Sequence, residues 1–250
     1  MAIETAAWPI FEAPLLEREM VAERTMSFRW RKPAGWNYRA GQFIDITLHD
    51  PPETDAEGDT RGFSISAAPC EDVIQITTRL RDTAFKRVLQ SVPLGTSMKL
   101  EGPFGDFHLH HAKRPAVLLA GGIGITPFRS MLVEAIRTGS LPYRVVLFHA
   151  NHRPVDAAFN AELRTLAEAD PNFEFVPVMT ALQPSEAWDG ERGHVDASML
   201  KRHIDEGADP IYYIAGPPGM VRGLREMLTA MAIDEDNIRT EEFTGYQENQ

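Results

Sequence analysis

The sequence predicts two domains: an antiparallel β-barrel over residues 1–112 and a doubly wound α/β domain with a parallel sheet over residues 113–250. Two observations predict this organisation. Up to about Leu109, short runs alternate apolar and polar residues with a period of two, as antiparallel strands do. From Arg114 onward, apolar strands alternate with helical patterns, which is typical of a parallel sheet covered on both faces.

Five or six strands are expected in the first part, because closing a small barrel removes exposed strand edges. The alternating runs are Met26–Arg31, Phe43–Leu48, Gly62–Ser66, Val73–Leu80 and Ser97–Gly102. The acidic segment Pro51–Thr60 predicts a surface loop, and Thr83–Ser91 is the one helix-like piece of this part.

In the second part, strands and helices are expected to alternate along the chain. The expected strands are Ala116–Ala120, Arg144–His149, Phe173–Met179, Ile211–Ala215 and Ile238–Phe243. The expected helices are Pro127–Thr138, Asp156–Glu168, Asp196–Asp205 and Met220–Met231.

Composition excludes several classes of protein. The 250 residues carry a formal net charge of −11, so a nucleic-acid or anionic-membrane surface is not expected. A single cysteine, Cys70, excludes a disulfide framework, a cysteine zinc finger and a four-thiolate iron–sulfur cluster. The longest apolar stretch, Ala116–Phe128, is shorter than the roughly 18 residues of a membrane helix, and the acidic N-terminus is unlike a secretory signal. We therefore expect a cytoplasmic protein.

A glycine-rich turn, Gly121–Pro127 (GGIGITP), directly follows the first apolar strand of the second part. Glycines let the backbone approach a phosphate, Thr126 is a candidate N-cap, and Pro127 suits the first helical position. The positive helix end then favours a pyrophosphate. Pro127 stands in place of the third glycine of GxGxxG, and a purely structural turn is the alternative.

A second turn, Ala215–Met220 (AGPPGM), also follows an apolar strand and opens a helix. Carboxyl ends of parallel strands lie on one edge of the sheet, where ligands of such folds bind. The two turns together are therefore a more specific sign of a ligand-binding edge than either turn alone.

In the first part, Arg61-Gly62-Phe63-Ser64 places a cation, an aromatic ring and a hydroxyl on one short strand. Arg61 and Phe63 share a face, and Ser64 points to the other face. Taken alone, this run predicts only a core phenylalanine beside a surface arginine.

Five motifs in order, RGFS, GPFG at Gly102–Gly105, GGIGITP, AGPPGM and EEFTGY at Glu241–Tyr246, resemble the ferredoxin–NADP reductase superfamily. The resemblance spans about Leu15 to Tyr246. It implies an FAD-binding barrel and an NAD(P)-binding domain. In the FAD domain it implies that Arg61 and Gly62 lie at the FAD diphosphate, Phe63 against the flavin and Ser64 near flavin N5, with Thr83 and Ala84 as a second phosphate contact.

For the nucleotide, the resemblance implies binding through Gly122, Gly124, Thr126, Gly216, Pro217 and Met220. Glu242 and Phe243 match the C-terminal segment near the nicotinamide face of the flavin, so Ser64, Glu242 and Phe243 are the expected catalytic residues. Two departures stand out: Phe63 replaces a frequent tyrosine, and Ala215 replaces a frequent cysteine.

The implied function is hydride transfer from NAD(P)H to FAD, followed by electron transfer to a separate ferredoxin, flavodoxin or oxygenase component. A reductase of small diffusible acceptors such as flavins or quinones is one alternative. A non-catalytic regulatory module that keeps the fold is another, although the intact glycines and Arg61 speak against it.

Nucleotide preference depends on the end of the second strand of the α/β domain. His149–Arg153 offers no acid at the tip, and Asn151 and Arg153 are the candidate contacts. Arg153 favours NADPH, with NADH as the alternative, because Asp156 fits better at the start of the next helix. Arg192 could reach the same edge.

Two further features are interpreted as structural. His108, His110 and His111 lack a nearby acidic or thiol partner at ligand spacing, so we expect no metal site but a solvated barrel end. Cys70 follows a proline in a polar turn and is expected to be an inert thiol.

Overall fold

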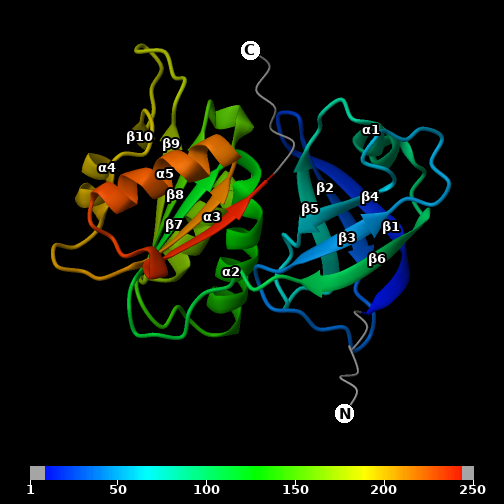
Figure 1. The fold of residues 1–250 in the computed structure, drawn as a ribbon, viewed down its shortest axis with the longest axis horizontal. Coiled ribbons are helices and arrows are strands. Elements are labelled where there is room, and N and C mark those ends of the chain that lie inside the picture. The colour runs from blue at the N-terminus through cyan, green and yellow to red at the C-terminus, as the bar shows by residue number, and fades with distance from the viewer. Residues whose placement is uncertain (1–8, 244–250) are drawn as a thin grey trace.

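Two six-stranded sheets organise the computed structural model, which describes residues 9–243 (Figure 1). One sheet forms the N-terminal lobe and the other, flanked by helices, forms the C-terminal lobe. The two-part architecture expected from the sequence is confirmed.

The N-terminal sheet is antiparallel and has the strand order β4-β3-β6-β1-β2-β5. A bridge between Ile65 and Ile76 joins the end of β4 to β5 and closes the sheet into a barrel around Phe28, Trp30 and their neighbours. Its strands are β1 (Ile10–Ala22), β2 (Thr25–Arg31), β3 (Phe43–Thr47), β4 (Thr60–Ser64), β5 (Val73–Arg79) and β6 (Ser97–Phe104).

The first strand is longer than the alternation after Leu15 indicates. Residues 10–14 pair with β6 and residues 15–22 pair with β2, with register shifts near Leu15 and Met20. One strand thus pairs with two neighbouring strands. The period-two pattern of a single run does not reveal this double pairing. The predicted helix is α1 (Ala84–Ser91), whose N-cap is Thr83.

The C-terminal sheet is parallel, with the order β10-β9-β8-β7-β11-β12. Its strands are β7 (Ala116–Gly121), β8 (Val145–Asn151), β9 (Phe173–Met179), β10 (Glu191–Arg192), β11 (Ile211–Gly216) and β12 (Ile238–Glu242). Its helices are α2 (Ile125–Thr138), α3 (Asn160–Ala169), α4 (Ala197–His203) and α5 (Pro218–Ala230). Apolar residues of α2 and α3 pack on one face and those of α4 and α5 on the other, so the doubly wound arrangement is confirmed.

Two helices begin differently from expectation. A short 3-10 helix, η1 (Gly122–Gly124), precedes α2, so Thr126 lies inside the first turn of α2 and its hydroxyl donates to the Ile123 carbonyl. Another 3-10 helix, η2 (Pro154–Asp156), is separated from α3 by Phe159 at φ 61°. The predicted N-cap at Thr126 and the predicted helix start at Asp156 are therefore wrong.

The solvated barrel end expected at the histidines holds for the exposed His111, while His108 is half-buried and His110 differs. His110 is buried, its ring stacks on Tyr143 at 4.4 Å, and its backbone N–H donates to the Tyr213 hydroxyl. His110 thus packs the connection between the lobes into the second core. Within residues 9–243, no group of three His, Cys, Asp or Glu side chains is placed to hold a metal ion.

None of the helices in the described part of the chain combines the length and the apolar character needed to traverse a bilayer.

An ion cluster on α2 joins the lobes; in Figure 1, α2 lies on the side of the parallel sheet that faces the barrel. Arg129 is buried, donates to the Ser66 carbonyl at 2.7 Å and pairs with Glu71 of the barrel lobe at 2.9 Å and with Glu162 of α3 at 2.7 Å. The neighbouring Ser130 hydroxyl donates to the Ala67 carbonyl at 2.6 Å. These contacts fix α2 against the segment that follows β4.

We expect Arg129→Met to lower the free energy of unfolding by about 3 kcal/mol, because it leaves two carboxylates without their buried partner. Arg137 contacts the same carboxylates from an exposed position, so Arg137→Met should cost less than about 1 kcal/mol. Urea denaturation of both variants measures the difference. Equal, small losses would show that Arg129 does not join the lobes.

Candidate functional site at the edge of the parallel sheet

Both glycine turns lie at the point where the order of the parallel strands reverses. The chain proceeds from β7 through β8 to β9 on one side and returns to β11 on the other side of β7. A Cβ atom on Gly216 would lie 3.1 Å from the Gly121 nitrogen, so the two turns touch. The expectation that they share one sheet edge is confirmed, and this switch point is where ligands bind in such sheets.

The glycines allow this close approach. A Cβ on Gly124 would lie 2.1 Å from the Ala215 carbonyl oxygen, and one on Gly121 would lie 2.2 Å from the Met220 sulfur. Gly124 thus lets the start of α2 pack directly on β11. A side chain at Gly124 would point into the protein, so backbone atoms form the other side of the turn.

A buried histidine supports the first turn. Gly122 adopts φ 51°, and the His149 Nε2 atom lies 2.9 Å from its carbonyl oxygen. Burial lowers the pKa of His149 to about 4, so the neutral ring donates its N–H to this carbonyl. Sequence reasoning did not single out His149, since an apolar strand pattern shows no partner for a polar side chain.

Asn151, at the end of β8, is buried, and neither its amide nitrogen nor its amide oxygen has a partner among the described residues. An unpaired buried amide is costly, because it loses its hydrogen bonds to water. Asn151 therefore offers a free donor and a free acceptor on the strand next to the first glycine turn, where the sequence places a nucleotide contact.

The barrel contributes Ser64 to the region near the second turn. Its hydroxyl lies 3.4 Å from the Glu241 carboxylate of β12, a long hydrogen bond between the two lobes. Burial raises the pKa of Glu241 from its ordinary value of 4.5 to about 7, and its second oxygen is buried without a partner in the described chain. Phe243 donates its backbone N–H to the Gly216 carbonyl at 3.0 Å, which ties the C-terminal segment to the second turn.

The carboxylate beside Ser64 thus belongs to Glu241 and not to Glu242. Successive strand residues point to opposite faces, and Glu242 is exposed. That Glu242 and Phe243 lie near the nicotinamide face of the flavin stays a prediction, and the contact with Ser64 adds Glu241 to the candidate residues. Residues 244–246 of the EEFTGY motif, and the N-terminal residues 1–8, lie outside the described residues.

At the other end of β4, Arg61 and Phe63 share a face, as expected. The Arg61 guanidinium lies over the Phe85 ring at 5.3 Å, and the Phe63 and Phe85 rings are 5.8 Å apart. Gly62 points to the opposite face, where a Cβ would come within 3.0 Å of an Asp45 oxygen.

Arg61 is held by the acidic loop that follows β3. It pairs with Asp55 at 2.6 Å and with Glu57 at 2.9 Å, and Asp55 also accepts a hydrogen bond from the backbone of Ala84 at the start of α1. A carboxylate of the chain itself therefore bridges the guanidinium and the helix N-terminus. Here the Asp55 carboxylate accepts hydrogen bonds from donors that the sequence indicated, Arg61 and the Thr83–Ala84 turn.

Lys86 adds a partly buried cation at this place. Its pKa is lowered to about 8, first by burial and then by the nearby charges of Arg81 and Arg61. Several cations at a helix N-terminus favour the binding of an anion with more than one charge. The residues present thus fit a diphosphate.

Arg153 follows β8, and it is paired twice. It lies 2.9 Å from Glu23 of the barrel and 3.4 Å from Asp156, with which it also forms a reciprocal backbone contact. The guanidinium that was expected to read a 2′-phosphate is therefore already neutralised by two carboxylates.

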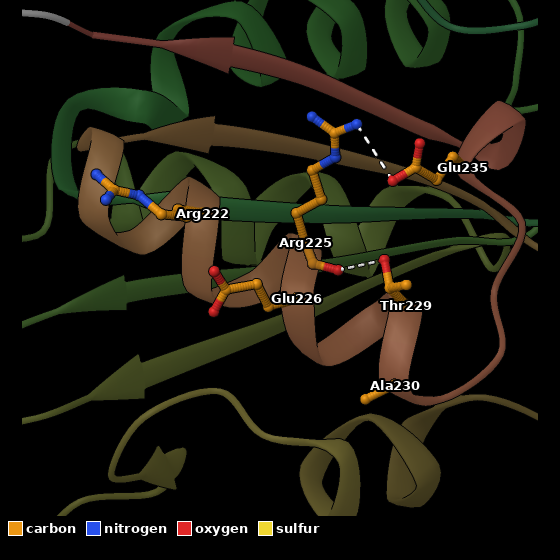
Figure 2. A pocket seen from close by; sticks show the side chains of 6 residues that line it. All are labelled: Arg222, Arg225, Glu226, Thr229, Ala230 and Glu235. Carbon is orange, nitrogen blue, oxygen red and sulfur yellow. Dashed lines mark hydrogen bonds and ion pairs between the residues drawn. The ribbon is translucent and has the colours of Figure 1, made fainter.

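A separate hollow of about 540 Å³ lies along the C-terminal part of α5 (Figure 2). Its lining includes Arg225, which reaches toward Glu235 at 3.4 Å, and Thr229, which donates to the Arg225 carbonyl. None of the site residues named above lines it, so it is not part of the candidate site.

Comparison with known proteins identifies the second lobe. Residues 118–226 match the family model described as "Oxidoreductase NAD-binding domain". The anthranilate 1,2-dioxygenase electron transfer component of Acinetobacter baylyi is 27% identical over 83% of this chain and 58% of its own length. The phenol hydroxylase P5 protein of Acinetobacter pittii is 25% identical over 93% of this chain and 65% of its own length. The chain thus spans less than two thirds of either relative.

The fold is shared with the FAD/NAD-binding domain of the nitric oxide dioxygenase from Vibrio cholerae. That structure superposes with a TM-score of 0.78 at 23% identity, over 93% of this chain and 98% of the other. Together, the matched NAD-binding domain and the barrel-plus-parallel-sheet fold make the chain similar to ferredoxin–NADP reductase-like FAD/NAD-binding proteins, as the sequence motifs imply.

Proposed function

We propose that the protein is an FAD-dependent oxidoreductase that takes a hydride from NAD(P)H and passes electrons to an acceptor outside these 250 residues. One observation carries the proposal: Ser64 of the barrel meets Glu241 at the edge where both glycine turns end. A flavin held by the barrel and a nucleotide held by the turns meet at this place. The FAD portion falls within residues 1–112 and the nucleotide portion within residues 113–250.

On the barrel side, the residues divide by the part of FAD that they hold. Arg61 and the Thr83–Ala84 turn bind the diphosphate, because a guanidinium and helix N–H groups donate to phosphate oxygens. Gly62 carries no side chain beside them. Phe63 would pack against a bound flavin, and the Ser64 hydroxyl would donate to it. When bound, FAD supplies the hydride-accepting and electron-donating chemistry.

On the nucleotide side, the backbone of the two turns binds the diphosphate of NAD(P)H. The residues concerned are Gly122, Gly124, Thr126, Gly216, Pro217 and Met220. Asn151 offers its free amide to a polar group of the nucleotide. Phe243, whose backbone N–H donates to Gly216, would shield a bound flavin from water.

Glu241 is the group at this site that can hold a proton near neutral pH. With a pKa near 7, its carboxyl is half protonated at neutral pH, and it can donate to or accept from the Ser64 hydroxyl at Oε1. Its free oxygen, Oε2, is available to a donor on a bound molecule.

The names of the relatives support a protein acceptor. By name, one is the electron transfer component of an anthranilate 1,2-dioxygenase, and the other is the P5 protein of a phenol hydroxylase. We propose a ferredoxin, flavodoxin or oxygenase component as the partner of this chain. A single cysteine in 250 residues is consistent with a reducing, cytoplasmic location.

The test of this function is the purified protein under anaerobic conditions. We expect it to release FAD on denaturation and to lose its flavin absorbance when NADH or NADPH is added. A protein that binds FMN or no flavin after reconstitution, or whose FAD is not reduced by either nucleotide, contradicts the proposal.

Arg61 and Asp55 should change FAD affinity in opposite directions. Arg61→Ala removes a charge-assisted contact of about 1.5–3 kcal/mol and should weaken FAD binding, whereas Asp55→Asn removes a competing carboxylate and should strengthen it. Calorimetric titration of the apoprotein with FAD measures both. If Asp55→Asn weakens binding as Arg61→Ala does, the loop supports the FAD site instead of competing for it.

Glu241 should make stability depend on pH. Its folded pKa lies above its unfolded value, so the neutral carboxyl stabilises the fold below about pH 4.5, and this stabilisation is lost progressively as the pH rises to about 7. Relative to Glu241→Gln, the free energy of unfolding of the parent should therefore fall by about 3 kcal/mol between about pH 4.5 and pH 8. Urea denaturation across this range is the measurement.

The matched control is Glu242→Gln, which changes the exposed neighbour and should not reproduce the effect of Glu241→Gln. If the free energy of unfolding of the parent relative to Glu241→Gln does not vary with pH, folding does not raise the pKa of Glu241, and the prediction is wrong.

A further inference from the structure

The loop after β8 is attached to the barrel through Glu23, in the turn between β1 and β2. The Glu23 carboxylate lies 2.9 Å from Arg153, and the Glu23 backbone N–H donates to the Val155 carbonyl at 2.8 Å. A second link joins Arg79 of β5 to Asp156 at 3.6 Å. A side chain of the N-terminal lobe is thus placed at the edge of the C-terminal sheet.

The position of this loop bears on which dinucleotide the protein binds. The loop follows the strand next to β7, and the end of that strand faces the ribose that distinguishes NADH from NADPH in folds of this kind. A carboxylate there accepts a hydrogen bond from a 2′-hydroxyl, whereas an unpaired arginine binds a 2′-phosphate.

The charges of the loop already balance. Arg153 and Arg79 contribute two positive charges, and Glu23 and Asp156 contribute two negative charges. A 2′-phosphate would add negative charge beside two carboxylates and would have to displace Glu23 to reach Arg153. A 2′-hydroxyl requires no such exchange.

Of the two carboxylates, Glu23 is the one that can be changed without disturbing the loop. Asp156 is buried and accepts from the backbone N–H of Arg153, so it holds η2 in place. Glu23 is about half exposed, at 48%, and exposed pairs of this kind contribute little to stability.

We propose that Glu23, a residue of the barrel, selects NADH over NADPH by occupying Arg153 and by accepting from the ribose 2′-hydroxyl. This inference rests on the proposed function, because it concerns the nucleotide of that same site. It replaces the preference for NADPH that Arg153 alone suggests.

The first experiment compares kcat/KM for NADH and NADPH in the parent and in Glu23→Gln. We expect the parent to prefer NADH. In Glu23→Gln, kcat/KM for NADPH should rise about tenfold, the scale of one charged contact, while that for NADH falls slightly because an amide is a weaker acceptor. Adding Arg153→Ala to Glu23→Gln should abolish the gain.

Glu19→Gln is the matched control, because Glu19 is an exposed β1 carboxylate paired with Arg29. It should leave the ratio of the two efficiencies unchanged. A parent that prefers NADPH, or an unchanged ratio in Glu23→Gln, overturns the inference.

A binding measurement separates this inference from the proposed function. Calorimetry with 2′-phospho-AMP and with AMP tests ribose recognition without hydride transfer, and Glu23→Gln should improve binding of 2′-phospho-AMP alone. If the parent keeps FAD but oxidises neither nucleotide, the proposed function fails and this inference fails with it. If hydride transfer is normal but the binding ratio does not move, only the inference fails.

Discussion

The contact of Arg129 with the segment after β4 is the interaction on which the candidate site depends. Arg129 lies on α2, whose first turn follows the glycine-rich turn, and it donates to the Ser66 carbonyl, two residues beyond Ser64. The same helix therefore sets the position of the nucleotide turn and of the barrel hydroxyl. Because its carboxylate partners come from both lobes, the cluster fixes the gap in which Ser64 meets Glu241.

Several buried polar groups gather in the same two regions. His149, Asn151 and Glu241 lie at the edge of the parallel sheet, and Lys86 lies at the start of α1. Each is costly to a folded chain, through an unpaired atom, a displaced pKa or both. Residues that reduce stability in this way concentrate where a protein binds or reacts, so their placement supports the motif-based site independently of the motifs.

Period-two and strand–helix patterns predicted both sheets and most element bounds, because burial of one face or both faces leaves a direct mark on the sequence. The glycine turns were also predictable, since close backbone approach at Gly124 and Gly216 requires glycine. The sequence does not show that Glu241, and not the adjacent Glu242, contacts Ser64, since this depends on how β12 lies against the barrel. The sequence also does not reveal the carboxylate partners of Arg61 and Arg153. These partners lie in a loop and in a distant turn, and no local sequence pattern predicts where either lies in the fold.

The two arginines show how similar pairs of charges lead to different ligands. Each guanidinium is oriented by two carboxylates of the chain, Arg61 by Asp55 and Glu57 and Arg153 by Glu23 and Asp156. Beside Arg61, Lys86 is partly buried and the α1 N-terminus adds its dipole, so further positive charge is available there to an incoming diphosphate. Beside Arg153, the second arginine, Arg79, is already paired with Asp156 and is not free to meet an incoming phosphate. In the proposed function, the balance of surrounding charge, and not the presence of an arginine alone, determines which of the two places accepts an anion.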